Sequence, residues 1–532
     1  MLSRAHPRRL AVTFTAIALL AALAAPPVGA NDVAESQGFR KAVTLAGIRE
    51  HQAALQAIAD DNGGTRVSSS PGYVASRDYV VEQLEAAGYD AHIQEFTFPF
   101  DGDASPPVFA QTSPAQVTYV DGVDYDTMQY SGSGDVTAGL WAIGLVIPAS
   151  PTPNGNTSGC ETTDFDGMPA GAIVLMQRGT CPFAQKVANA DAEGASAAVV
   201  MNEGTPGFGD RNNLLTGTLG APGVADIPAI GTTAALGVTL SNGVLNGATG
   251  LTVRVRTDIL VDTRTTWNVW AETSTGDPNR VVVVGAHLDS VTRGPGINDN
   301  GSGSAAILEI AETFAAQDRE ARNKLRFMWY GAEEFGLLGS EHYVENLSDA
   351  EIDQIMAMVN FDMVGSPNFA RFVYDGDNST FPPVPGQVGE GPPGSAYIED
   401  LFIDYFNSQG LANEPTPFSG RSDYGPFIIE GIPAGGLFTG AEGVKTAEQV
   451  ELYGGTAGQQ YDPCYHLACD TYDNNSNSGL DSMSDAAAHV VLTLSRVKVD
   501  VRLTEASAPL KTPKGLQKDG YHDHRLDKAV SR

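Results

Sequence analysis

RVVVVGAHLDSVTRGPGINDNGSGSAAILEIAETFAAQDREARNKLRFMWYGAEE, residues 280–334, is the stretch that decides the fold. Its two hydrophobic runs, 281–284 and 325–330, have the composition of buried strands. Between them, one face of residues 302–314 carries apolar side chains at the i, i+3, i+4, i+7 spacing of a helix that packs on a sheet. These side chains are Ile307, Ile310, Ala311 and Phe314. The order strand, helix, strand predicts neighbouring parallel strands.

The same alternation extends outward in both directions. A strand pattern at 267–272 precedes the stretch, and a helix pattern at 339–347 and a strand pattern at 356–362 follow it. We therefore predict an α/β fold with a mostly parallel mixed sheet, covered by helices on both faces. In such sheets ligands bind at the carboxyl ends of the strands.

The chain before this region has two kinds of sequence. Residues 43–59 and 71–87 have helical spacing, and residues 91–98 alternate like a strand. From 99 to 265 the pattern changes to short β-like segments with turns rich in Gly, Pro and Thr. We predict a catalytic-type domain made of residues 31–98 and 266–507, interrupted by a β-rich insertion at 99–265.

The N-terminus has the features of an export signal. Three arginines precede an apolar run at 10–25, and Val28-Gly29-Ala30 is a small-residue cleavage pattern. Residues 1–30 are therefore predicted to be a secretory signal peptide. A membrane anchor is the alternative, but the run is shorter than the roughly 20 apolar residues of a span.

Export permits disulfides, and the chain has four cysteines. Three connectivities are possible. Pairing of the nearest neighbours, Cys160–Cys181 and Cys464–Cys469, is the simplest of them, and the spacing does not suggest a zinc knuckle.

The formal net charge of −32 argues against nucleic acid or an anionic membrane as a partner. We expect a secreted, extracellular monomer whose charge keeps it soluble. Residues 508–532 contain few apolar side chains and several lysines, which is typical of a disordered or removable tail.

Candidate metal ligands follow the predicted strands directly. A two-zinc hydrolytic site needs His and carboxylate ligands, one of which bridges the ions. The chain offers such a set, which is His287, Asp299, Glu334, Asp362 and His466. Each one alone is more often solvated or packed, but charged groups at the ends of buried strands are uncommon unless they are paired or metal-bound.

The other histidines are weaker candidates. His51, His92, His342 and His489 lie in helix-like or strand-like contexts and are expected to lack acidic partners. His342, which follows Glu341, is the nearest competitor and is expected at the surface.

Two further carboxylates suit supporting roles. Asp289, two residues after His287, can accept the second ring N–H of that ligand and fix its tautomer. Consecutive side chains at a strand end diverge, so Glu333 and Glu334 cannot easily share one metal. One can ligate while the other acts as a general base.

Six motifs resemble the secreted two-zinc aminopeptidases of the bacterial leucyl-aminopeptidase type: GAHLDS, GINDNGSG, GAEEFGLLGS, NFDMVG, GRSDYGPF and CYHLACD. They occur in the family's order. The stretch GAIVLMQRGTCPFAQKVANADAEGASAAVVMNEG within the insertion resembles the protease-associated domain. For that module the resemblance implies an accessory role in substrate access or protein contacts, and a mere spacer is the alternative.

The resemblance implies a zinc exopeptidase fold and release of N-terminal residues, large apolar ones such as leucine, from peptides or proteins. It implies two zinc ions bound by the five ligands, with Asp299 bridging. It also implies Glu333 as the general base, Asp289 as the acid that orients a histidine, and Tyr465 as the group that steadies the tetrahedral intermediate.

Some assignments stay open. Arg421 falls near the substrate in the family, although an ion pair with Asp423 has equal weight. Asp481 and Asp485 could hold a structural calcium ion, but the acidic residue that relatives add near position 42 is missing. An inactive binding protein, a related carboxypeptidase or dipeptidase, and a one-zinc glutaminyl cyclase are the rival functions. No ligand position is substituted, which disfavours the inactive scaffold.

Overall fold

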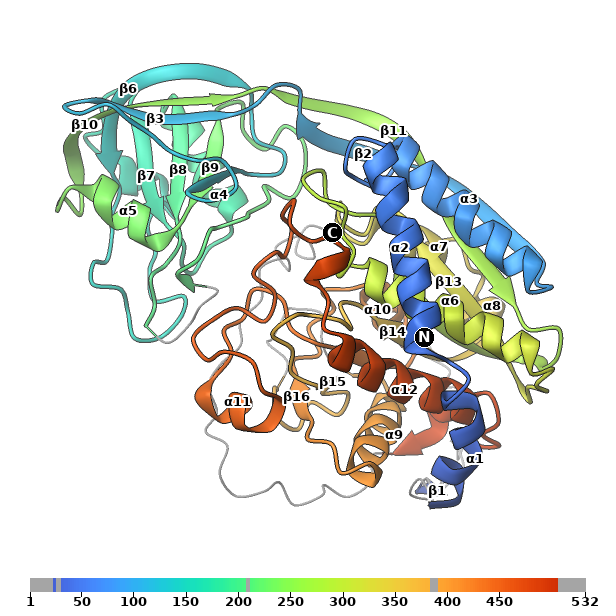
Figure 1. Ribbon diagram of the computed structural model, residues 1–532. Helices are drawn as coiled ribbons and strands as arrows, with labels where there is room; N and C mark the ends of the chain where they lie inside the picture. Colours follow the sequence, from blue (N-terminus) through green and yellow to red (C-terminus); the bar gives the residue numbers. More distant parts are fainter. Residues whose placement is uncertain (1–22, 25–29, 207–210, 383–390, 506–532) are drawn as a thin grey trace, which may run out of the picture.

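A computed structural model describes residues 23–24, 30–206, 211–382 and 391–505. The predicted signal peptide and the predicted tail lie almost entirely outside these ranges. Within them the chain forms two α/β units, each built on an eight-stranded sheet, and Figure 1 shows them side by side.

The larger unit holds the stretch 280–334. Its sheet has the order β16-β15-β17-β14-β12-β13-β11-β2, with parallel pairing through β17, β14, β12 and β13 and antiparallel pairing at β15, β11 and β2. The mostly parallel mixed sheet is therefore confirmed. The strands are β2 (Ala91–Asp103), β11 (Ile259–Glu272), β12 (Asp277–His287), β13 (Asn323–Tyr330), β14 (Ile355–Phe361), β15 (Phe372–Tyr374), β16 (Glu414–Thr416) and β17 (Ala434–Phe438).

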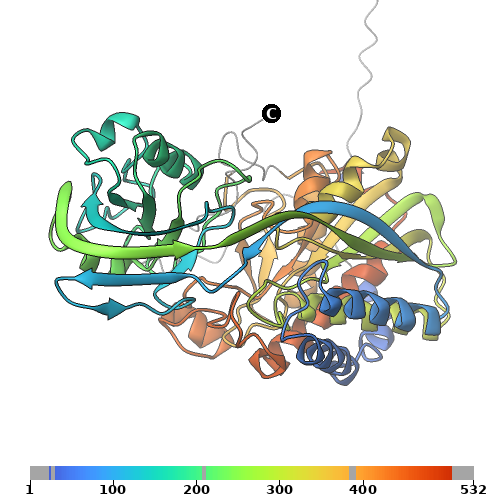
Figure 2. The ribbon, with the colours of Figure 1, turned by 90° about the horizontal axis from the view of Figure 1, so that it is seen from above.

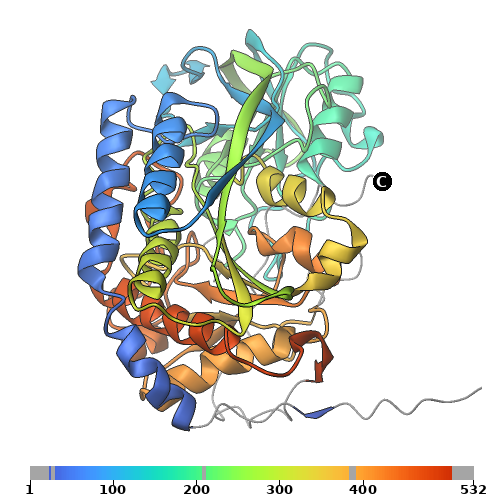
Figure 3. The ribbon, with the colours of Figure 1, turned by 90° about the vertical axis from the view of Figure 1, so that its right-hand side faces the viewer.

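Helices cover both faces of this sheet, and strand alternation decides which core each side chain joins. In β12, Val282 and Val284 point into a core shared with α1, α2, α3, α6, α9 and α12, whereas Val281 and Val283 point toward α7 and α10. The helices are α1 (Ala30–Arg40), α2 (Leu45–Asp61), α3 (Pro71–Ala86), α6 (Gly301–Ala316), α7 (Leu338–Glu345), α8 (Asp349–Gln354), α9 (Ser395–Ser408), α10 (Tyr424–Ile429), α11 (Ala447–Tyr453) and α12 (Asn477–Leu494). Figure 3 shows the helices that pack against Val282 and Val284 along one side of the sheet; these are α1, α2, α3, α6, α9 and α12.

The inserted unit has a mixed sheet of order β4-β3-β10-β6-β7-β8-β9-β5 with α4 (Phe183–Ala192) and α5 (Ala234–Ser241). Its strands are β3 (Val108–Ser113), β4 (Val117–Thr118), β5 (Tyr125–Thr127), β6 (Gly134–Ala142), β7 (Ile173–Gln177), β8 (Ala197–Met201), β9 (Ala229–Thr232) and β10 (Gly247–Thr257). A short parallel pair, β1 (Leu23–Ala24) with β18 (Thr504–Glu505), lies apart from both sheets.

A two-stranded ribbon joins the units. Strands β2 and β11 pair continuously from Ala91↔Ala271 to Asp103↔Ile259, and Figure 2 shows them running from one unit to the other. The predicted boundaries at 99 and 265 fall inside this ribbon. The insertion thus enters and leaves through adjacent strands of the larger sheet, which holds it beside the carboxyl ends of β12–β14.

Candidate metal centre

Three parallel strands bring the first ligands together. His287 is the last residue of β12, Asp362 follows the end of β14, and Glu334 lies four residues after β13. Because β12 pairs with β13 on one side and β14 on the other, their carboxyl ends meet at one edge of the sheet. The strand order therefore explains why residues up to 75 positions apart converge.

Asp299 is brought to the same edge by the start of α6. The N-cap Asn300 accepts from the backbone N–H groups of Gly303 and Met363, at 2.9 and 3.2 Å. Helix and strand approach so closely that a Cβ on Gly303 would lie 2.0 Å from the Phe361 carbonyl oxygen. Only glycine permits this contact, which fixes Asp299 beside Asp362.

The side chains form two groups that share Asp299. In one, His287 Nε2 lies 3.2 Å from Asp299 Oδ1 and 3.3 Å from Asp362 Oδ1. In the other, His466 Nε2 lies 3.2 Å from Asp299 Oδ2 and 3.2 Å from Glu334 Oε2. A tetrahedral ion with bonds of about 2.0 Å keeps its ligand atoms about 3.3 Å apart, so both groups have the spacing of zinc ligands.

Hydrogen bonding supports the same interpretation. Nε2 of His287 and Oδ1 of Asp362 are both buried, and within the described residues neither has a hydrogen-bond partner. A buried polar atom without a partner is costly, and a bound cation would satisfy both atoms at once. The residues present therefore fit a metal ion.

The electrostatics of the cluster also call for positive charge. Burial alone would lower the pKa of His287, but Asp362 and Glu333 raise it well above its usual value. Burial also lowers the pKa of His466, but the neighbouring carboxylates of Glu334 and Asp299 raise it by more. The resulting pKa of His466 is about 10. Without metal the site would hold protons on its histidines, and a dication would replace them.

His466 comes from a loop far along the chain. The Cys464–Cys469 disulfide spans it, with Cα atoms 5.3 Å apart, and His466 has a left-handed backbone with φ of 60°. The ring of Tyr465 stacks on that of His466, with centroids 3.8 Å apart. The second disulfide, Cys160–Cys181, lies in the insertion, so both predicted pairings are present.

Asp289 lies close to His287 through both its carbonyl and its carboxylate, and its predicted role stays a prediction. The ring Nδ1 of His287 lies 3.1 Å from the backbone carbonyl of Asp289, whereas the carboxylate oxygen is 3.7 Å away. The Asp289 carboxylate also accepts from the Glu333 N–H at 3.2 Å. Asp289 therefore contacts both the candidate ligand His287 and the backbone of the glutamate pair.

Sequence reasoning missed several supporting residues. The Asp470 carboxylate accepts from the backbone N–H groups of Asn298 and Asp299, both at 2.9 Å. Ser422 donates to Asp362 Oδ2 at 2.5 Å. The motifs CYHLACD and GRSDYGPF contain both residues, but only the fold shows which ligand each one supports.

Arg421 has a different partner from the predicted alternative. Its Nη1 lies 3.4 Å from Glu442 Oε1, and among the described ion pairs none joins it to Asp423. Asp423 is fully buried, and burial raises its pKa to about 7.

Two of the other histidines correct the prediction that they lack acidic neighbours. His51 Nε2 lies 3.6 Å from Glu312 and 3.8 Å from Glu309, because α2 packs against α6. His92 lies 3.8 Å from Asp90. A helix packing contact across more than 250 residues leaves no local signal in the sequence.

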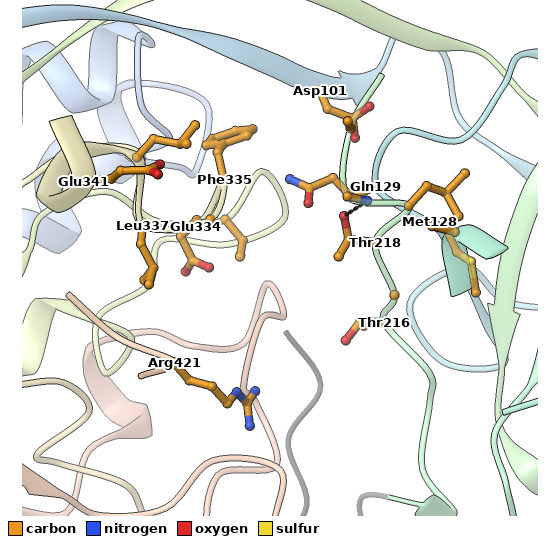
Figure 4. Close-up of a pocket in the computed structure, with 18 of the residues that line it drawn as sticks. Asp101, Met128, Gln129, Thr216, Thr218, Glu334, Phe335, Leu337, Glu341 and Arg421 are labelled. Carbon is orange, nitrogen blue, oxygen red and sulfur yellow. Dashed lines mark hydrogen bonds between the residues drawn. The ribbon is translucent and has the colours of Figure 1, made fainter. Parts of the chain in front are cut away.

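Two of the candidate ligands, Glu334 and His466, line a cleft of about 970 Å³ between the two units. Figure 4 shows Glu334, Phe335, Leu337, Glu341 and Arg421 on the larger unit facing a wall from the insertion. Labelled residues of that wall are Asp101, Met128, Gln129, Thr216 and Thr218. Among the described residues, this cleft leads to the candidate centre beside the inserted unit.

Comparison with known proteins gives two family matches. Peptidase family M28 matches residues 268–491, and the PA domain matches residues 143–240. The chain is 47% identical over 455 residues to "Aminopeptidase" of Pseudomonas aeruginosa, covering 85% of this chain and 81% of that protein. It is 40% identical over 452 residues to "Leucine aminopeptidase 2" of Arthroderma otae, covering 84% and 82%.

Solved structures agree. The aminopeptidase from Aneurinibacillus sp. strain AM-1 has a TM-score of 0.64 at 26% identity, covering 90% of this chain and 100% of that chain. BSAP, a zinc aminopeptidase from Bacillus subtilis, shares the fold with a TM-score of 0.58 at 23% identity, covering 84% and 94%. Together with the ligand geometry, these findings show that the chain belongs to peptidase family M28, as a zinc aminopeptidase and peptide-bond hydrolase with an inserted PA domain.

Proposed function

We propose that this protein is a secreted two-zinc aminopeptidase that removes the N-terminal residue of peptides and prefers large apolar residues such as leucine. The observation that carries the proposal is the placement of two histidines against opposite oxygens of Asp299, each with a second carboxylate at 3.2 or 3.3 Å. His287 and Asp362 would hold one ion and His466 and Glu334 the other, with Asp299 as a ligand that the two groups share. The name of the fungal relative supports leucine.

The proposed mechanism uses residues at the same edge of the sheet. When bound, zinc supplies Lewis acidity and lowers the pKa of a coordinated water. Glu333, whose Oε2 lies 4.0 Å from His287 Nε2, takes the proton of the attacking water and passes it to the leaving amine. Tyr465 donates a hydrogen bond to the oxyanion that develops on the scissile carbonyl.

Substrate binding follows from the cleft. Arg421 lines it and is assigned to the substrate carbonyl or the product carboxylate. Acidic side chains at the metal end hold the free α-amine, which restricts cleavage to N-termini. Because the PA domain forms the opposite wall, we assign it to substrate access and not to a spacer role.

We do not include calcium in this proposal. Asp485 lies 3.6 Å from Arg40 Nη1, so an arginine already neutralises part of the Asp481 and Asp485 pair. Two carboxylates beside a fixed cation make a poor calcium site, since calcium takes six to eight oxygen ligands.

Secretion is supported by the two disulfides. No helix among the described residues is long and apolar enough to cross a membrane. "Probable lipoprotein aminopeptidase LpqL" of Mycobacterium tuberculosis is 39% identical over 85% of both chains. In this chain all four cysteines are in disulfides, so none remains to carry a lipid. We propose that the protein acts as a monomer.

A matched pair of substrates tests the activity. We expect hydrolysis of leucine p-nitroanilide and none of N-acetyl-leucine p-nitroanilide, which differs only in its blocked amine. Release of the C-terminal residue from an N-blocked peptide would instead favour the carboxypeptidase. Chelation should abolish the activity, and a His287→Ala/His466→Ala variant should contain two zinc ions fewer than the wild type. A difference of one ion would contradict the two-zinc centre.

A further inference from the structure

A second group of ligand-type side chains lies where α2 crosses α6. His51 comes from α2, and Glu309 and Glu312 come one turn apart from α6. One nitrogen and two carboxylate oxygens from these residues lie within 4.8 Å of one another. In Figure 1 the two helices run on the same side of the larger sheet. None of these residues takes part in the proposed mechanism.

The histidine is prepared as a ligand. His51 is 5% exposed, and its Nε2 is buried with no hydrogen-bond partner among the described residues. Its other ring nitrogen, Nδ1, lies 2.8 Å from the Tyr79 hydroxyl. In the tautomer that donates Nδ1–H to Tyr79, the Nε2 lone pair is directed at the carboxylates, as in histidines that bind metals.

The carboxylates are held in place but not neutralised. Glu309 uses Oε1 to accept from the N–H and the hydroxyl of Thr44, at 3.0 and 3.2 Å. Its Oε2 faces His51, and a Cβ on Gly47 would come within 2.3 Å of that oxygen, so glycine leaves the space it occupies. In the described part of the chain no lysine or arginine pairs with Glu309 or Glu312.

The distances distinguish a metal from a simple ion pair. A hydrogen-bonded imidazolium–carboxylate pair has an N···O separation of about 2.7–2.9 Å. His51 Nε2 is 3.6 Å from Glu312 Oε2 and 3.8 Å from Glu309 Oε2. These separations are closer to the 3.2–3.3 Å found between the ligands of the catalytic centre. The nitrogen and the carboxylate oxygens are too far apart for a hydrogen bond, and an ion fits between them.

We propose that His51, Glu309 and Glu312 bind a further divalent transition-metal ion, zinc in the first place, which joins α2 to α6. An imidazole and two carboxylates suit zinc better than calcium or magnesium, which take oxygen ligands. Glu312 has 28% of its side chain exposed, so water completes the coordination. The ion ties α2 to the helix whose first turn follows Asp299.

Zinc content tests the proposal. Wild type, His51→Gln and a control, Glu82→Gln, are purified from zinc-supplemented medium, and zinc per chain is measured by mass spectrometry. Glu82 is an exposed glutamate near Tyr79 and is not one of the proposed ligands. We expect one zinc ion fewer in His51→Gln than in the other two, with hydrolysis of leucine p-nitroanilide retained. Equal zinc in all three would overturn the proposal.

The result does not depend on the catalytic centre. The proposal predicts a difference of one ion whether that centre holds two zinc ions or one, and activity is read separately. Should His51→Gln fold poorly, Glu312→Gln removes the half-exposed ligand with less disturbance. Added zinc should then raise the melting temperature of the chelator-treated wild type by more than that of Glu312→Gln. An equal rise in both proteins would contradict the site.

Discussion

Glu333 and Glu334 are adjacent, yet the proposal gives them different tasks, and replacing the first separates catalysis from metal binding. Glu333→Gln removes the general base but keeps the volume and the ligand set. We expect unchanged zinc content and a kcat lower by about 10²–10⁴. Steady-state kinetics with leucine p-nitroanilide and metal analysis of the same sample check this. Glu341→Gln, in the same cleft, is the control, and near-normal turnover of Glu333→Gln would refute the assignment.

Asp470 tests the support of the bridging ligand. Its carboxylate holds two successive backbone N–H groups, those of Asn298 and Asp299. Without it the Asp299 loop loses its orientation, so Asp470→Ala should lower zinc affinity by about 10–100-fold. Activity should return when zinc is added in excess. Asp473→Ala, at an exposed neighbouring residue, is the control and should have the zinc affinity of the wild type. An unchanged zinc affinity in Asp470→Ala would show that the Asp299 loop keeps its orientation without Asp470.

The convergence of the five proposed ligands could be predicted because each one follows a hydrophobic strand or lies in a motif with a known order. Their supports could not be predicted so well. Asp470 acts on a residue 171 positions away, and Ser422 on one 60 positions away. The predicted acceptor for His287 was the Asp289 side chain, whereas the nearer oxygen is that residue's own carbonyl. Sequence patterns place a side chain on a helix, strand or loop, but tertiary packing decides which atom it contacts.

The loop closed by Cys464 and Cys469 provides a prediction about a single structural element. A disulfide across so short a loop removes little chain entropy, so it should add little to global stability. Its effect is to orient Tyr465 and His466. We expect the Cys464→Ser/Cys469→Ser variant to lose more than about tenfold in kcat/KM with a small change in melting temperature.

The matched control for that variant is Cys160→Ser/Cys181→Ser. This disulfide lies in the PA domain and joins two segments that carry no proposed metal ligand, so its loss should affect stability before activity. A reducing agent should reproduce the loss of activity in the wild type. Equal activity of the two double variants would show that the loop keeps its shape without its disulfide.

The junction of α1, α9 and α12 should make the protein sensitive to acid. His489 is fully buried, bonds to Ser36 at 2.8 Å and stacks on Tyr405. Burial, with Arg40 nearby, lowers its pKa to about 4. In the unfolded chain His489 therefore binds a proton near pH 6.5, whereas in the folded chain it binds one only near pH 4. The free energy of unfolding therefore falls as the pH falls from about 6.5 to about 4.

His489→Phe removes the titrating group and keeps the stacking. Between pH 7 and pH 4, the wild type should lose about 2–3 kcal/mol more of its unfolding free energy than this variant. Urea unfolding at both pH values measures the difference. His92→Phe, at a partly exposed histidine, is the control. Parallel losses in the wild type and in His489→Phe would place the acid sensitivity elsewhere.

Most helices and strands could be predicted from periodicity and from their capping residues. Ser70 caps α3 by accepting from Tyr73, and the helix ends close to Gly88, as the sequence indicated. The ribbon was harder to foresee. In β2 the buried residues Phe96, Phe98 and Phe100 continue the alternation past residue 98, where the change in composition suggested that the domain ended. The composition of β2 changes where its packing neighbours change. Its length is set by the pairing with β11, which continues to Asp103.

The arrangement of the two units makes the PA domain part of the catalytic cleft. Besides the β2–β11 ribbon, one side chain links them close to the metal centre. Arg293, in the loop between β12 and α6, donates to Asp121 at 2.9 Å and to Asp126 at 2.6 Å, and both acceptors belong to the insertion. The same loop carries Asp299, so a movement of the insertion would change the cleft without passing through the ribbon.

Arg293→Ala should therefore loosen the cleft and leave the metal centre intact. Loss of a partly buried ion pair leaves the Asp126 carboxylate without its charge partner, at a cost of about 1–2 kcal/mol, which raises the population of open arrangements roughly tenfold. We expect a higher KM for peptides long enough to reach the PA wall, with kcat and zinc content unchanged. Leucine p-nitroanilide, which is too short to reach that wall, should be affected little.

Arg254→Ala breaks an exposed ion pair within the insertion and serves as the control. Hydrogen exchange should rise at Asp121–Asp126 in Arg293→Ala alone, and unchanged exchange together with unchanged KM would mean that the ribbon holds the PA domain by itself.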